Sequence, residues 1–126
     1  MTKTVSTLMQ PRVWTIDVDD TVDEVKALFA RERLSWAPVI SEEGVVLGVI
    51  SATDLLRQLA SGADAAAKPA WQLCTYKPIT VSPDATLKEL ARLMIDKGIH
   101  HVVVMDGAKI VGVVSSLDFV RAFIAD

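Results

Sequence analysis

Two short polar motifs in the sequence could do chemistry, and they have the same spacing. A serine stands three residues before an aspartate in GVISATDLLRQL, as Ser51 and Asp54, and again in GVVSSLDFVRAF, as Ser115 and Asp118. One interpretation is a capping box, in which the serine and the acid satisfy backbone N–H groups at the start of a helix. The other is a nucleotide site, because a helix start suits a phosphate and a carboxylate accepts ribose hydroxyl protons. Spacing alone favours the capping box.

The motifs belong to a repeat that covers most of the chain. TIDVDDTVDEVKALF (15–29) aligns with TVSPDATLKELARLM (80–94), and in each a threonine three residues before a glutamate predicts a helix start. Apolar residues then recur on one helical face. Short β-branched runs separated by SEEG or DG predict buried strands joined by hairpins. A second helix is expected in each half, over 54–59 and 118–124.

This pattern predicts a mixed α/β (α+β) fold made of two pseudo-symmetric β-α-β-β-α repeats. The boundaries we expect are repeat 1 over 1–62, a linker over 63–70 and repeat 2 over 71–126. A repeat of about 60 residues is marginal for an independent core. We therefore expect the repeats to pack face to face through their sheets and to be stable only together.

Composition excludes several classes of function. The net charge of -3, from 13 basic and 16 acidic residues, argues against a nucleic-acid groove. The single cysteine, Cys74, and the absence of a signal-peptide pattern predict a cytoplasmic protein, and the apolar runs are too short to span a membrane. Neither a Gly-x-Ser-x-Gly motif nor a P-loop occurs, and Cys74 has no base near it in sequence. We expect no enzymatic activity.

Three features of the sequence resemble a pair of CBS domains, which are named after cystathionine β-synthase. They are the order of elements, the Gly-apolar-apolar-Ser-x-x-Asp pattern that closes each half, and the middle strands PVI and VVVMD. The resemblance covers the chain from about Thr7 to Ile124. It implies two clefts between the repeats, which in many members bind AMP, ADP, ATP or S-adenosylmethionine. It also implies frequent pairing into homodimers, no catalysis and no required cofactor.

The resemblance also implies roles for residues of the two motifs. It assigns the ribose to Asp54 and Asp118, and the phosphates to the hydroxyls just before them. These hydroxyls belong to Ser51 and Thr53 in the first copy and to Ser115 in the second. Leu117 replaces a hydroxyl in the second copy, which weakens the case for phosphate contacts there.

The segments that lead into each repeat resemble the family's ligand-bordering segment, and each is expected to face the aspartate of the opposite repeat. This implies two groups of ligand-binding residues: Thr75, Lys77 and Ile79 with Ser51, Thr53 and Asp54; and Gln10, Arg12 and Trp14 with His100, Ser115 and Asp118. Lys77 and Arg12 are equally well explained as solvated surface charges.

Two adjacent histidines begin a strand in the second half. Neighbouring residues of a strand point to opposite faces, so His100 and His101 are poorly arranged to share a metal, and no metal site is expected. In nucleotide-binding CBS domains a histidine matching His100 meets a phosphate, and His101 takes the following basic place. The matching residues of the first half are Ser35 and Trp36. Trp36 either stacks on an adenine, fills the cleft or caps the core edge.

Glycines at 48 and 112 precede both motifs. Each indicates either a strand bulge or a place where a side chain would crowd a neighbouring backbone or a ligand.

The sequence thus predicts a regulatory module that senses an adenine nucleotide or adenosyl ligand and signals to an unidentified partner protein. The alternative is a protein–protein interaction or assembly module with empty clefts, which Trp36 and Leu117 favour because both depart from a polar nucleotide site. A third hypothesis is redox or metal sensing through Cys74 and the histidines.

Overall fold

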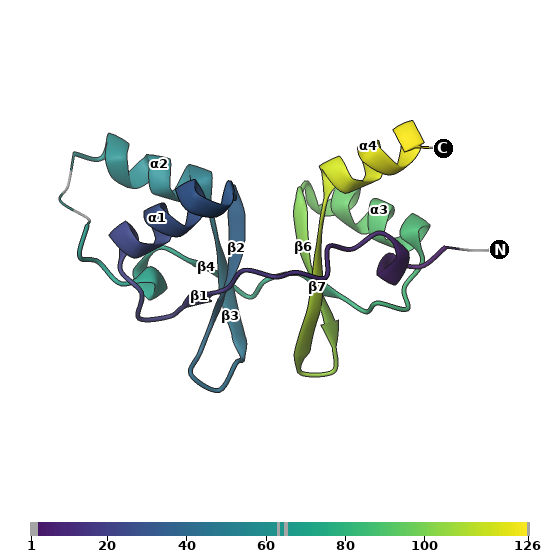
Figure 1. Cartoon of the computed structure of the whole chain (residues 1–126), viewed down its shortest axis with the longest axis horizontal. Helices are drawn as coiled ribbons and strands as arrows, with labels where there is room; N and C mark the ends of the chain where they lie inside the picture. The colour runs from purple at the N-terminus through teal and green to yellow at the C-terminus, as the bar shows by residue number, and fades with distance from the viewer. Residues whose placement is uncertain (1–2, 63, 65, 126) are drawn as a thin grey trace. The chain divides into compact units, whose positions relative to one another are not determined.

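A computed structural model describes residues 3–62, 64 and 66–125, and the chain divides into two compact units (Figure 1). The Asp54 unit is Trp14–Pro78, and the Asp118 unit combines the segment up to Val13 with the segment from Ile79 onward. Within these residues, four α-helices and two sheets confirm the predicted mixed α/β class. The compact units do not follow the order of the repeats, because each contains the lead-in segment of the other repeat.

The Asp54 unit is a sheet of order β1-β2-β3-β4 with both of its helices on one face (Figure 1). β1 runs parallel to β2, and the other neighbours are antiparallel. Its elements are β1 (Ile16–Asp17), α1 (Val22–Glu32), β2 (Trp36–Ile40), β3 (Val46–Ser51), α2 (Ala52–Ala60), the short helix η2 (Ala70–Gln72) and β4 (Thr75–Tyr76). Ile16, Val39 and Ile50 are fully buried at the centre of its core.

The Asp118 unit repeats this plan with a sheet of order β5-β6-β7. Its elements are the short helix η1 (Val5–Thr7), β5 (Thr80–Val81), α3 (Leu87–Lys97), β6 (His101–Asp106), β7 (Lys109–Ser115) and α4 (Ser116–Ala125). Gln10 forms an isolated antiparallel bridge to Val113, at the edge of the sheet where β4 stands in the other unit. Leu90, Val102 and Val104 lie fully buried in its core.

Each repeat is preceded by a lead-in segment, and these segments, which contain Val5 and Ala70, are part of the hydrophobic core of the compact unit to which they belong. The Val5 side chain is fully buried, and its N–H donates to the Ala85 carbonyl at 2.8 Å. In the other unit Ala70 is fully buried, and its N–H donates to the Asp20 carbonyl at 2.7 Å. The predicted linker 63–70, of which 63 and 65 lie outside the described residues, therefore ends in a packed position.

The helices start where side chains can cap them. Thr21 and Glu24 form the predicted capping box, and the Thr86 hydroxyl accepts the Glu89 N–H at 3.0 Å. The second helix of each unit starts earlier than predicted, at Ala52 and at Ser116. The motif serines stand immediately before the helix, so the residues between serine and aspartate already belong to it.

The two glycines at matching positions of the copies, Gly48 and Gly112, each lie under a lead-in segment. A Cβ built on Gly48 would overlap the Thr75 carbonyl oxygen and approach the Cys74 sulfur to 3.1 Å. A Cβ on Gly112 would meet the Met9 sulfur at 2.7 Å and the Gln10 carbonyl oxygen at 3.1 Å. The predicted close backbone approach is therefore present in both units.

We expect Gly48→Ala to be more destabilising than Gly112→Ala, by about 3 against about 1 kcal/mol in urea unfolding, the range found for overpacked sites. The backbone carbonyl over Gly48 cannot move without disturbing β4, whereas the Met9 side chain over Gly112 can rotate. Equal losses in the two variants would contradict this explanation.

Candidate functional site

Both serine–aspartate motifs form complete capping interactions. In the Asp54 unit, the Ser51 N–H and hydroxyl donate to Asp54 Oδ2 at 2.8 and 3.0 Å, and the Asp54 N–H donates to Ser51 Oγ at 3.2 Å. In the Asp118 unit, the Ser115 N–H and hydroxyl donate to Asp118 Oδ2 at 2.7 and 3.2 Å, and the Asp118 N–H donates to Ser115 Oγ at 3.3 Å. The capping interpretation is therefore correct for both copies.

The cap uses only one oxygen of each carboxylate. Oδ2 is held by the serine, which fixes the orientation of the carboxyl group at the start of the helix. Oδ1 is left to other donors, and a carboxylate oxygen can accept more than one hydroxyl proton. Capping and ligand binding are consequently compatible at the same aspartate.

The two Oδ1 atoms have different partners. Asp54 Oδ1 accepts a bond from Arg57 Nη1 at 3.2 Å, and the Arg57 side chain is 73% exposed. Asp118 Oδ1 accepts a bond from the Gln10 side-chain amide at 3.2 Å, with Arg121 Nη1 farther away at 3.8 Å. The carboxylate side chains are 14% and 6% exposed, respectively. Asp118 is thus the more enclosed of the two.

Several predicted residues of the first half lie around Asp54. Trp36 is half-buried and stands opposite Ser51 in the β2–β3 ladder, and the Ser35 carbonyl accepts the Ala52 N–H at 2.8 Å. Thr75 pairs with Val49 at the sheet edge. Thr53, on the first turn of α2, is exposed. Lys77 is also exposed and has a left-handed backbone with φ of 60°.

The Asp118 unit places its predicted residues in the same way. His101 stands opposite Ser115 in the β6–β7 ladder, and the His100 carbonyl accepts the Ser116 N–H at 2.9 Å. Gln10 contacts Asp118 directly, as the predicted grouping requires. Arg12 is exposed in the same unit. Trp14 and Ile79, the last residues of the two predicted groups, belong in each case to the other compact unit.

The two histidines have different surroundings. His101 is half-buried and His100 is exposed. Burial lowers the pKa of His101, and the neighbouring His100 lowers it further, whereas the Asp118 carboxylate acts in the opposite direction. His101 is therefore the histidine beside the motif, and it favours the neutral form near neutral pH.

Cys74 has surroundings that oppose redox chemistry. The residue is buried under β3, and burial raises the pKa of its thiol, although a hydrogen bond with Tyr76 lowers it. A raised pKa reduces the thiolate fraction, which is the reactive form. Among the described residues, no three His, Cys, Asp or Glu side chains converge as a metal site would require.

Sequence reasoning missed Arg57 and Arg121. Each lies one helical turn beyond its aspartate and faces Oδ1, at 3.2 and 3.8 Å. The available signal was that both copies carry arginine at the matching position. Because both arginine side chains are exposed, these ion pairs contribute little to stability.

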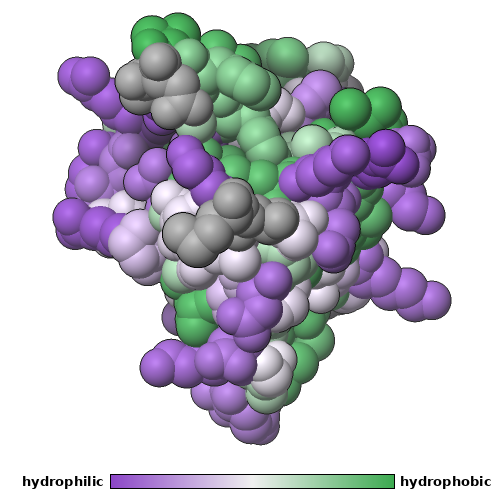
Figure 2. Space-filling model, turned by 90° about the vertical axis from the view of Figure 1, so that its right-hand side faces the viewer, coloured by the Kyte–Doolittle hydropathy of each residue, from purple (hydrophilic) through white to green (hydrophobic). Residues whose placement is uncertain are grey.

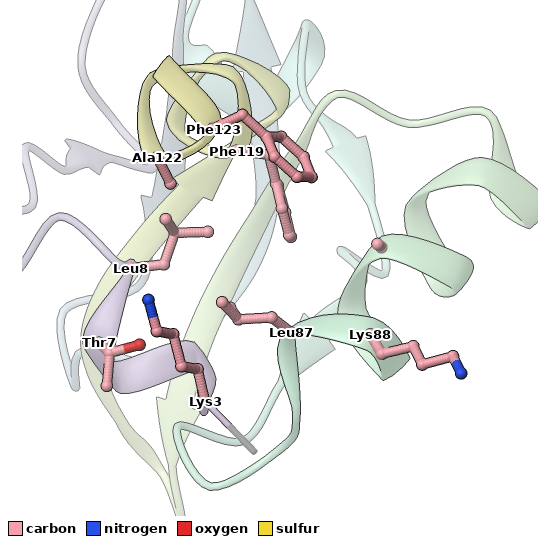
Figure 3. Close-up of a pocket in the computed structure, with 9 residues that line it drawn as sticks. Lys3, Thr7, Leu8, Leu87, Lys88, Phe119, Ala122 and Phe123 are labelled. Carbon is pink, nitrogen blue, oxygen red and sulfur yellow. The ribbon is translucent and has the colours of Figure 1, made fainter. Parts of the chain in front are cut away.

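Cavities of about 400 Å³ lie beside the helices of each unit, and Ala52 of the first motif is among the residues that line one of them. In the Asp118 unit, Phe119 and Phe123 extend from α4 toward Leu87 of α3 and line an apolar cavity (Figure 3). In the Asp54 unit, Leu55 and Leu59 of α2 line a cavity beside α1. The described part of the chain has no helix of sufficient length and apolar character to cross a membrane.

A family model for the CBS domain matches the chain twice, over residues 5–61 and 70–125. The chain belongs to the CBS-domain family. The two matches coincide with the two copies of the motif, so each Ser-x-x-Asp cap lies in its own CBS domain.

Relatives and solved structures match nearly the full length of the chain. MJ1225 of Methanocaldococcus jannaschii is 25% identical over 119 residues, which cover 94% of this chain and 42% of that protein. AcuB from Vibrio cholerae is 26% identical, with a TM-score of 0.89 and coverage of 99% and 93%. CBSX2 of Arabidopsis thaliana, solved in complex with AMP, is 26% identical, with a TM-score of 0.83 and coverage of 98% and 97%. The chain spans less than half the length of the M. jannaschii relative.

The lowered pKa of His101 predicts a loss of stability in acid. The unfolded chain, with an ordinary histidine pKa of about 6.5, binds the proton before the folded chain does. The free energy of unfolding should therefore fall as the pH decreases from about 6.5 through the lowered pKa. Urea unfolding between about pH 7 and about pH 5 measures this loss.

His101→Gln should flatten that decline, and His100→Gln should retain most of it because His100 is exposed. The same acid decline in the wild type and in His101→Gln would show that another group is responsible.

Proposed function

We propose that this CBS-domain pair is a cytoplasmic, non-catalytic regulatory module that binds an adenine nucleotide or adenosyl ligand (AMP, ADP, ATP or S-adenosylmethionine) and signals to a partner protein. The observation that carries the proposal is the Asp54 carboxylate. Its Oδ2 is fixed by Ser51, while its Oδ1 is bonded, within the described part of the chain, only to an exposed arginine. The AMP complex of CBSX2, a relative of 26% identity, supports this class of ligand.

The residues around Asp54 suit the parts of a nucleotide. Asp54 Oδ1 would accept the ribose hydroxyl protons, and its fixed orientation reduces the entropy lost on binding. Thr53 and the start of α2 would meet phosphate oxygens, because the first N–H groups of a helix favour an anion. Trp36 would offer an aromatic face to the adenine.

Signalling requires that the ligand prefer one conformation of the module. A ligand shifts a conformational equilibrium only by its difference in affinity for the two states. The two lead-in segments connect the two compact units along the chain, and Thr75 lies in one of them, beside β3. A ligand held at Asp54 would therefore act directly on a connecting segment.

Thermal unfolding with and without AMP tests the ribose role of Asp54. AMP at about 100 times its dissociation constant should stabilise the wild type by roughly 2.7 kcal/mol. Asp54→Asn should abolish the shift, because its amide oxygen can still accept the cap bonds while its amide nitrogen replaces the second acceptor. Asp118→Asn is the matched control and should retain the shift. An unchanged shift in Asp54→Asn would remove the ribose role.

A second candidate function, assembly, rests on exposed apolar side chains. On α4, Leu117 and Val120 are about half exposed, and Phe123 and Ile124 are 79% and 80% exposed. Figure 2 shows hydrophobic side chains gathered at the top of one face, the level at which α4 lies in Figure 1. Contiguous apolar surface of this kind marks association sites. We propose that two copies of the chain associate through the α3–α4 face as a homodimer.

Light scattering during size-exclusion chromatography tests this association. Phe123→Asp should reduce the measured mass from that of two chains to that of one, because a buried charge at an apolar interface is strongly unfavourable. Val45→Asp, which changes an exposed apolar residue in the β2–β3 turn of the other unit, should leave the mass unchanged. A wild type with the mass of one chain would refute the dimer.

A further inference from the structure

Gln10 and Thr75 occupy the same backbone position in the two units but carry different side chains. Gln10 bridges Val113 next to Gly112, and Thr75 pairs with Val49 next to Gly48. Both positions therefore lie against the strand that leads into the Ser-x-x-Asp motif. The glutamine side chain is long enough to reach the aspartate of its unit, and its amide nitrogen lies 3.2 Å from Asp118 Oδ1.

The contact adds a hydrogen bond to the two that the Asp118 carboxylate accepts from Ser115. Oδ2 accepts two bonds from Ser115, and Oδ1 accepts one from Gln10, while the side chain is only 6% exposed. In the first copy, Oδ1 of Asp54 is bonded only to the exposed Arg57 among the described residues. Among the described residues, a ribose hydroxyl would meet an acceptor bonded only to a solvent-exposed arginine at Asp54, and one bonded by a part-buried amide at Asp118.

We propose that Gln10 is an internal competitor for the ribose at Asp118, so that the two CBS domains bind an adenine nucleotide with unequal affinity. The inference rests on the proposed nucleotide-binding function. Ligand at Asp118 competes with the Gln10 amide, whose part-buried hydrogen bond to a charged group is stabilising, whereas ligand at Asp54 competes with a solvent-exposed ion pair that contributes little. The domain that carries Asp54 fills first, and the one that carries Asp118 fills only at higher concentration.

A second difference acts in the same direction. Thr53 supplies a hydroxyl on the first turn of α2, where α4 carries the apolar and half-exposed Leu117. The second copy therefore has both an occupied ribose acceptor and one polar group fewer for the phosphates. The Gln10 contact is removed by a single exchange with the first copy, Gln10→Thr.

The test separates the two sites by removing one aspartate at a time. In Asp54→Asn, calorimetric titration with AMP measures the affinity of the Asp118 site alone. Adding Gln10→Thr to this variant should tighten AMP binding about five- to tenfold. In Asp118→Asn, the titration reads the Asp54 site alone, and adding Thr75→Gln should weaken binding by a similar factor, because the new amide can reach Asp54. Both substituted positions are exposed, and thermal unfolding verifies that each variant folds.

Two results would overturn the inference, and only one of them would also refute the proposed nucleotide-binding function. Equal AMP affinity with and without Gln10→Thr, in a protein whose Asp118→Asn variant binds AMP, refutes the competitor and leaves the nucleotide-binding function intact. No AMP binding by the wild type or by any variant, Gln10→Thr included, refutes both.

Discussion

Each compact unit depends on a segment that precedes the other repeat in sequence. Val5 completes the core of the Asp118 unit, and Ala70 completes the core of the Asp54 unit, each by full burial and by backbone hydrogen bonds. The exchanged segments then run over Gly48 and Gly112, where the absence of a side chain permits the approach. Neither repeat alone contains all the residues of one core, so the two must fold as a pair.

The same constraint brings the polar residues together. The strand under the exchanged segment ends at the motif serine, and the serine starts the helix that carries the aspartate. A residue of the exchanged segment is therefore always close to the aspartate of the unit it joins. In one unit this residue is Thr75, and Asp54 Oδ1 is bonded to the exposed Arg57 instead; in the other it is Gln10, which bonds Asp118 Oδ1. A fold requirement thus determines which side chains can tune the site.

Sequence periodicity and capping patterns were sufficient for the helices and for the mixed α/β class, because local hydrogen bonds at Thr21 and Ser51 decide where helices begin. The crowding at Gly48 was also foreseeable from its repetition. Residue spacing could not reveal which side chain bonds Oδ1 of each aspartate, since that depends on the directions of the Arg57 and Gln10 side chains. Nor could it show that His101, rather than His100, is the half-buried histidine beside Ser115.

The proposed function depends above all on a capped aspartate that binds a ribose through its second carboxylate oxygen. A crystal structure of the protein with AMP at a concentration that fills only the tighter site tests this directly. We predict ribose hydroxyls within hydrogen-bond distance of Asp54 Oδ1, with the Ser51 cap to Oδ2 intact and the Gln10 bond to Asp118 still formed. AMP bound with its ribose away from both aspartates would contradict the account.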